Sequence, residues 1–136
     1  MWGKEYAVAK VANVQEYVRE LKEKYSDRIE FRVGAYPIFG FKDDEPRRWE
    51  VFEEGAKIAD YIGTLPERDA RPGHIGFKEH FRRVLELGNK LGKEVQMHVD
   101  QTNHPDERGT ETLVEAVRWL RPDRSGHLSH QEPTVW

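Results

Sequence analysis

The sequence predicts an α/β fold of parallel β/α repeats that form an arc, in other words a partial TIM-like barrel. Segments with helical periodicity alternate along the 136 residues with short segments of strand character. Each clear strand is apolar on one face and polar on the other, whereas a strand between two helical layers is apolar on both. A barrel with a polar interior accommodates such strands, and three of them are too few to close it.

Four segments have the periodicity of amphipathic helices, expected at residues 13–25, 46–58, 76–92 and 110–120. Asn13 can cap the first helix, and Pro46 stands in the first turn of the second, where its missing N–H costs nothing. Gly92 ends the third helix and Pro122 stops the fourth. The first helix places on one face Val14, Tyr17, Val18, Leu21 and Tyr25. The third places inward Phe77, Phe81, Val84, Leu85 and Leu91.

Three segments are expected to be strands, at residues 28–37, 59–68 and 93–99. The first alternates strictly and stops at Pro37, with Ile29, Phe31, Val33 and Ala35 toward the helices and Glu30, Arg32, Gly34 and Tyr36 on the other face. The second runs into a polar loop. In the third, Val95, Met97 and Val99 oppose Glu94, Gln96 and His98. Charges from neighbouring strands can pair across the polar interior.

Composition excludes several functional classes. Charged residues make up 35% of the chain and the net charge is only −3, so the basic stripe of a nucleic-acid-binding module is missing. There is no cysteine for thiolate chemistry, and no apolar run approaches the ~20 residues of a membrane helix. We expect a cytoplasmic protein without nucleic-acid or membrane partners. Residues 1–121 form the barrel domain and 122–136 an irregular tail.

Candidate site residues stand where the strands end, because ligands bind at the carboxyl ends of parallel strands. The three ends read AYPIFG, LPER and HVDQ. His98 is either a hydrogen-bonded structural residue or a metal ligand, and the residue pattern leaves both open. His104 is a turn residue or a substrate contact, while His74 and His80 fit a loop and a helix surface without chemistry. His127 and His130 fall in the predicted tail.

The motif LPERD, followed about thirty residues later by VQMHVDQTNHPDERGTETL, resembles the cytosine-deaminase-like branch of the amidohydrolase superfamily. Ala35-Tyr36-Pro37 matches that branch's third-strand turn, Pro66-Glu67-Arg68 its fourth strand end, and the run from His98 to Gln101 its fifth-strand motif. The resemblance covers residues 13–120 and implies strands three to five of a (β/α)8 barrel. It implies a zinc or iron ion with His98 as ligand and catalytic positions at Asp100 and Gln101, while a capping or turn role for Asp100 stays open. It also implies that Glu67 and Arg68 line the mouth of the site as substrate contacts, and the alternative is that both are surface loop charges.

Departures from the family narrow the expected function. Members carry a His-x-His pair and further ligands on later strands, whereas no His-x-His occurs here and the chain ends where a sixth strand would begin. Gln101 replaces a proton-shuttling glutamate. We therefore expect a fragment of a metal-dependent amidohydrolase for C–N bonds of cyclic amides, amidines or aminated heterocycles, inactive alone.

Two alternatives remain open. One is a non-catalytic α/β module or a self-assembling truncated barrel. The other is a small metalloprotein built on His98, His127 and His130. Open sheet edges predict a homo-oligomer, most simply a dimer.

Overall fold

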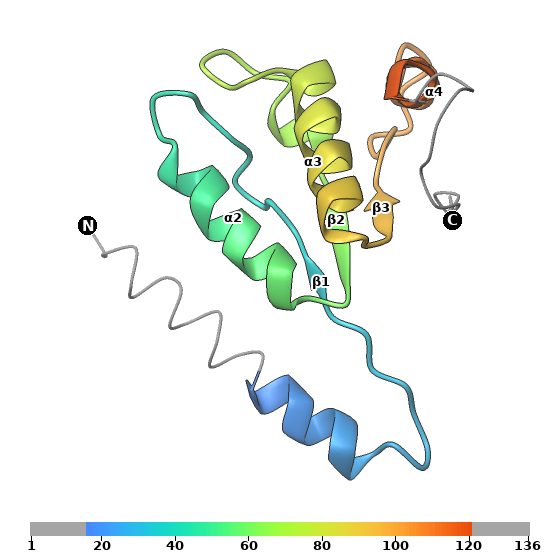
Figure 1. Ribbon diagram of the computed structural model, residues 1–136. Coiled ribbons are helices and arrows are strands. Elements are labelled where there is room, and N and C mark those ends of the chain that lie inside the picture. Colours follow the sequence, from blue (N-terminus) through green and yellow to red (C-terminus); the bar gives the residue numbers. More distant parts are fainter. Residues whose placement is uncertain (1–15, 121–136) are drawn as a thin grey trace, which may run out of the picture.

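The computed structural model describes residues 16–120, which form a parallel sheet covered by helices (Figure 1). Strand order in the sheet is β1-β2-β3, with all neighbours parallel, so β1 and β3 are both edges of the described sheet. The α/β fold of parallel repeats is therefore confirmed. The elements are β1 (Gly34–Ala35), α2 (Arg47–Ile58), β2 (Tyr61–Thr64), the 3-10 turn η1 (Pro66–Arg68), α3 (Phe77–Leu91), β3 (Val95–Met97) and α4 (Gly109–Leu120).

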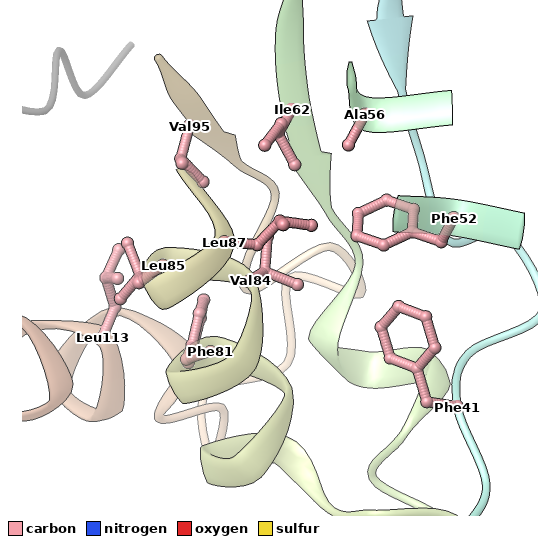
Figure 2. Packing of buried hydrophobic residues seen from close by; sticks show 10 residues of the cluster. All are labelled: Phe41, Phe52, Ala56, Ile62, Phe81, Val84, Leu85, Leu87, Val95 and Leu113. Carbon is pink, nitrogen blue, oxygen red and sulfur yellow. The ribbon is translucent and has the colours of Figure 1, made fainter. Parts of the chain in front are cut away.

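The core lies between the sheet and the helices α2 and α3 (Figure 2). On α3 the predicted inward residues Phe81, Val84 and Leu85 are buried, and Ile62 of β2 and Val95 of β3 face them. Burying a Phe or Leu side chain stabilises a fold by about 1.5–3 kcal/mol, so α3 supplies much of the stability. The helix ends at Gly92 in the left-handed conformation, as predicted.

Lys93, which lies just before β3, connects the end of α2 to β3 through hydrogen bonds. The Nζ of Lys93 donates to the carbonyl oxygens of Ala56, Lys57 and Ala59 at 2.7, 2.7 and 2.5 Å. These carbonyls belong to the last turn of α2 and its cap, where the helix has no donors of its own and its dipole favours a cation. A single ammonium group therefore satisfies the carboxyl end of α2.

The strands are shorter than predicted. Only Gly34–Ala35 of the segment 28–37 is strand, and Ile29 and Phe31, expected to face the helices, are exposed. A strand persists only where a neighbour completes its hydrogen bonds, and β1 pairs with β2 at just two positions. The second segment divides into β2 and η1 because Pro66 stands at the first position of that turn.

The first predicted helix is only partly described, as residues 16–24. On its predicted apolar face Tyr17 is 63% exposed and Tyr25 36%, so this face is not buried among the described residues. An ion pair between Lys22 and Asp60 links the helix to the turn before β2. Asp60 also accepts from the Val33 N–H at 2.6 Å. Val14, His127 and His130, and the proposed tail from residue 122, lie outside the described residues.

No helix in residues 16–120 is long and apolar enough to cross a membrane.

Candidate functional site

The carboxyl ends of β2 and β3 bring two of the predicted site residues together. Glu67 lies in η1 directly after β2, and Gln101 follows β3. The Nε2 of Gln101 donates to Oε2 of Glu67 at 3.4 Å and to the carbonyl oxygen of His98 at the same distance. The other carboxylate oxygen of Glu67, Oε1, is buried and has no hydrogen-bond partner among the described residues. A buried, unpaired acceptor therefore lies on the same carboxylate that receives the Gln101 amide.

Tyr36 joins this group, although its residue type alone did not mark it as a site residue. Its hydroxyl lies 3.2 Å from Nε2 of His98 and 3.4 Å from Oε1 of Gln96, and its ring centroid is 5.5 Å from that of His98. Tyr36 follows β1 and His98 follows β3, so the ring must lie across β2. A Cβ on Gly63 would stand 2.0 Å from Cε1 of Tyr36. The missing side chain of Gly63 therefore makes the contact possible.

The polar face pairs its charges as the alternation predicted. Arg32, just before β1, contacts Glu94, just before β3, at 3.0 Å. The pair spans β2 and is partly exposed, so it contributes little net stability. Burial and the neighbouring Tyr61 raise the pKa of Tyr36 to about 12, which keeps its hydroxyl protonated at neutral pH.

Asp100 is directed at the start of α4. Its Oδ1 accepts from the Gly109 N–H at 2.7 Å, and its Oδ2 accepts from the Thr110 N–H at 3.0 Å and the Thr110 hydroxyl at 2.5 Å. These bonds hold the pKa of Asp100 below its usual value. Asp100 adopts a positive φ of 54° to reach them. The carboxylate thus serves two N–H groups that a helix leaves unpaired at its start.

The other two predicted substrate contacts lie in exposed segments. The side chain of Arg68 is exposed, and its carbonyl oxygen accepts from Nε of Arg71 at 2.8 Å. His104 is exposed in the loop before α4, where its Nδ1 accepts from the Asp106 N–H at 3.3 Å and its own N–H donates to Glu107 at 3.1 Å. The structure gives neither of them a contact with His98 or Gln101.

A buried polar cluster lies beneath the same edge. Asp69 and His80 are fully buried, with Nδ1 of His80 2.6 Å from Oδ2 of Asp69. His74 places its Nδ1 2.8 Å from Oδ1, and the Phe41 N–H donates to that oxygen at 2.7 Å. Burial raises the pKa of Asp69, but the hydrogen bonds from His80, His74 and Phe41 outweigh it and lower the pKa overall. Asp69 is therefore a buried carboxylate anion.

The expectation that His80 lies on the helix surface is wrong, because its side chain is fully buried. His74 does lie in a loop, as expected, but its side chain is largely buried against Asp69. A signal was present, because His80 follows Phe77 by three residues and precedes Val84 by four, which places it within the apolar stripe of α3. Its polar partner, Asp69, carries no comparable mark in the sequence.

The described residues do not form a complete metal centre. Among residues 16–120 no three His, Asp or Glu side chains are grouped so that they hold an ion. His98 is the one imidazole at the strand ends, and its Nε2 lies against the Tyr36 hydroxyl. A catalytic zinc site uses three protein ligands, so these residues fit at most one part of such a site.

Comparisons with known proteins were made for the whole chain. No family model matches the chain. An uncharacterized protein of Haemophilus influenzae is 33% identical over 94 residues, which are 69% of this chain and 33% of that protein. The chain thus spans about a third of the length of this curated relative.

Two solved structures resemble the fold, both of 5-methylcytosine deaminase from Klebsiella pneumoniae. The structure with phosphonocytosine has a TM-score of 0.64 and 22% identity, and covers 77% of this chain and 25% of the deaminase. The structure with 5-fluorocytosine has a TM-score of 0.65 and 20% identity, and covers 83% and 27%. At this identity the likeness shows the fold alone. The described residues have an α/β fold similar to part of this deaminase.

Proposed function

We propose that this chain is a segment of an amidohydrolase that acts on C–N bonds of cyclic amides, amidines or aminated heterocycles, and that the segment is inactive alone. The observation that carries the proposal is that Gln101 bonds the carboxylate of Glu67 and the backbone carbonyl of His98 at the carboxyl edge of a parallel sheet. Parallel α/β folds bind their ligands at this edge. The likeness to a 5-methylcytosine deaminase fold supports the same class.

The polar groups suit an amide-containing ring. Gln101 has both a donor and an acceptor in its side chain, so it can hydrogen-bond a substrate carbonyl and N–H. The buried Oε1 of Glu67 could accept from a substrate only after a movement that exposes it. A glutamine cannot take up and release a proton, so this set favours substrate binding over proton transfer. Zinc or iron, expected from the family resemblance, would need ligands from outside residues 16–120.

The alternative is a non-catalytic module that assembles with itself. It is favoured by the two edges that β1 and β3 form among residues 16–120, and by the hydrogen bond that already engages His98. Sedimentation of the purified chain over a range of concentrations tests this. A dimer that dissociates on dilution supports self-assembly, and a monomer at high concentration contradicts it.

The enzyme proposal is tested in a chimera. The matched segment of the Klebsiella deaminase is replaced by this chain, and metal content and ammonia release from 5-methylcytosine are measured. We expect a metal-loaded protein with low turnover, loss of metal in His98→Ala, and a roughly 10²-fold or greater gain in turnover in Gln101→Glu, because a general acid–base is then present.

The chimera also provides its own control. Lys90→Ala changes an exposed residue of α3 far from the strand ends and should leave metal and turnover unchanged. If a folded chimera keeps its metal in His98→Ala, His98 is not a ligand and the proposal fails.

A further inference from the structure

We infer that His80 and Asp69 are positioning residues, which fix the turn η1 and thereby hold Glu67 against Gln101. The importance of this for catalysis rests on the proposed function, whereas the geometry stands without it. The Asp69 N–H donates to the carbonyl oxygens of Pro66 and Glu67, so the two residues act on the Glu67–Gln101 pair through the backbone of η1.

One imidazole ring joins both ends of η1. Leu65 directly precedes the turn, and its N–H donates to Nε2 of His80 at 3.2 Å. Asp69 directly follows the turn, and its Oδ2 lies 2.6 Å from Nδ1 of the same ring. His80 itself is carried by α3, the helix that packs on the core. The three residues of η1 are therefore held to α3 at both ends. We call this arrangement of Leu65, Asp69 and His80 the clamp.

The hydrogen-bond directions fix the state of the ring. A backbone N–H only donates, so Nε2 of His80 must accept and carries no proton. Nδ1 then carries the proton and donates to Asp69, which makes His80 a neutral imidazole of one tautomer. Asp69 remains an anion because it receives three donors. No partner in the clamp can be exchanged without leaving a buried polar group unpaired.

The clamp also includes the loop after β1. Asp69 accepts from the Phe41 N–H, and a Cβ on Gly40 would stand 2.3 Å from the same carboxylate oxygen. Gly40 has a φ of 66°, which an L side chain rarely adopts. The loops that follow β1 and β2 are therefore fixed to one another through a single carboxylate.

The unpaired oxygen of Glu67 indicates why the turn needs support. A 3-10 turn of three residues has poor hydrogen-bond geometry and little stability of its own. The buried Oε1 of Glu67 has no partner among the described residues, and leaving such an acceptor unpaired is unfavourable. Without outside support the turn would relax and turn this oxygen toward water. The clamp holds it in place.

The test measures the coupling of Glu67 to Gln101 by NMR in the full chain. Glu67→Ala removes the partner of the Gln101 amide, and we expect it to shift the side-chain NH2 signals of Gln101. The same substitution is then made in a His80→Phe background, where a ring of similar size has no nitrogens. If the clamp positions Glu67, the shift caused by Glu67→Ala disappears in that background.

Val84→Ala is the matched control, since it removes buried volume from the same helix without breaking either hydrogen bond. The shift of the Gln101 signals caused by Glu67→Ala must persist in the Val84→Ala background. If His80→Phe does not fold, His80→Asn decides the matter, because its NH2 group can still donate to Asp69 while its shorter side chain places no acceptor at the Nε2 position that the Leu65 N–H contacts. A full Glu67 effect in either folded His80 variant overturns the inference. No metal, substrate or turnover enters this experiment, so its result is independent of the chimera.

Discussion

Replacing Gly63 with alanine tests how Tyr36 reaches His98 across the central strand. The new Cβ would lie 2.0–2.3 Å from three carbons of the Tyr36 ring, whereas carbon atoms in contact lie about 3.5–4.0 Å apart. The ring must therefore move by about 1.5 Å. Its hydroxyl is already 3.2 Å from His98 and 3.4 Å from Gln96, so this displacement breaks both contacts.

The change in the free energy of unfolding caused by Gly63→Ala follows from two opposing effects. Forcing an extra methyl group into a packed site costs about 1–3 kcal/mol. Replacing glycine by alanine restricts the unfolded chain and returns about 0.4–1 kcal/mol. The free energy of unfolding should therefore fall by about 1–2 kcal/mol, with the contact energies lost at the half-buried Tyr36 included in that range.

Urea denaturation followed by tryptophan fluorescence measures this change, and Tyr36→Ala supplies the second background. With the ring removed, Gly63→Ala should cost nothing or become slightly stabilising, because only the effect on the unfolded chain remains. The His98 ring signals in NMR should shift in Gly63→Ala as the neighbouring aromatic ring leaves. An equal cost in both backgrounds would show that Tyr36 does not occupy the space above Gly63.

Three further predictions concern the groups that hold the loops and helix ends. Asp69→Asn should lower the free energy of unfolding at pH 7 by about 1–3 kcal/mol, because a buried acceptor is replaced by a group that cannot receive all three donors. The pKa of Asp69 is lowered in the folded state, so the contribution of this carboxylate to the free energy of unfolding is complete above about pH 4 and is lost as the pH falls through the folded pKa. Urea denaturation should therefore show that the difference in unfolding free energy between the unchanged protein and Asp69→Asn becomes smaller in acid. Lys93→Met should lower the free energy of unfolding by about 1–2 kcal/mol in the same assay, because the last carbonyls of α2 lose their donor. An unchanged midpoint of urea denaturation would contradict the capping role of Lys93. Asp100→Ala should reduce the helical circular dichroism signal and the melting temperature by loosening the start of α4, while Asp100→Asn, which keeps one acceptor, should lose less.

The helices could be predicted closely from the sequence because their signals are local. The second was expected at 46–58 and spans Arg47–Ile58, and the third was expected at 76–92 and spans Phe77–Leu91. Pro46 and Gly92 fix these ends through backbone geometry that does not depend on the rest of the chain. Strand lengths depend on partners instead, which explains why the segment 28–37 keeps only two paired residues.

In the candidate site, too, some features could be predicted from the sequence and others could not. His98, Gln101 and Glu67 could be found because strand ends in a parallel fold meet at one edge, and two of them do touch. The contact of Tyr36 with His98 could not be predicted, since it depends on the register that places Gly63 between them. The buried pair of Asp69 and His80 joins residues eleven positions apart through a tertiary contact that no periodicity reports.

The clamp on η1 has a consequence for insertions and deletions. Asp69 and His80 lie on either side of the loop from 70 to 76, so a residue added at its exposed tip near 72 leaves both ends of the clamp where they are. A residue added inside α3 before His80 would instead turn the imidazole by about 100° around the helix axis, away from both partners. Length variation among relatives of this chain should therefore gather in the loop and be absent from the first turn of the helix.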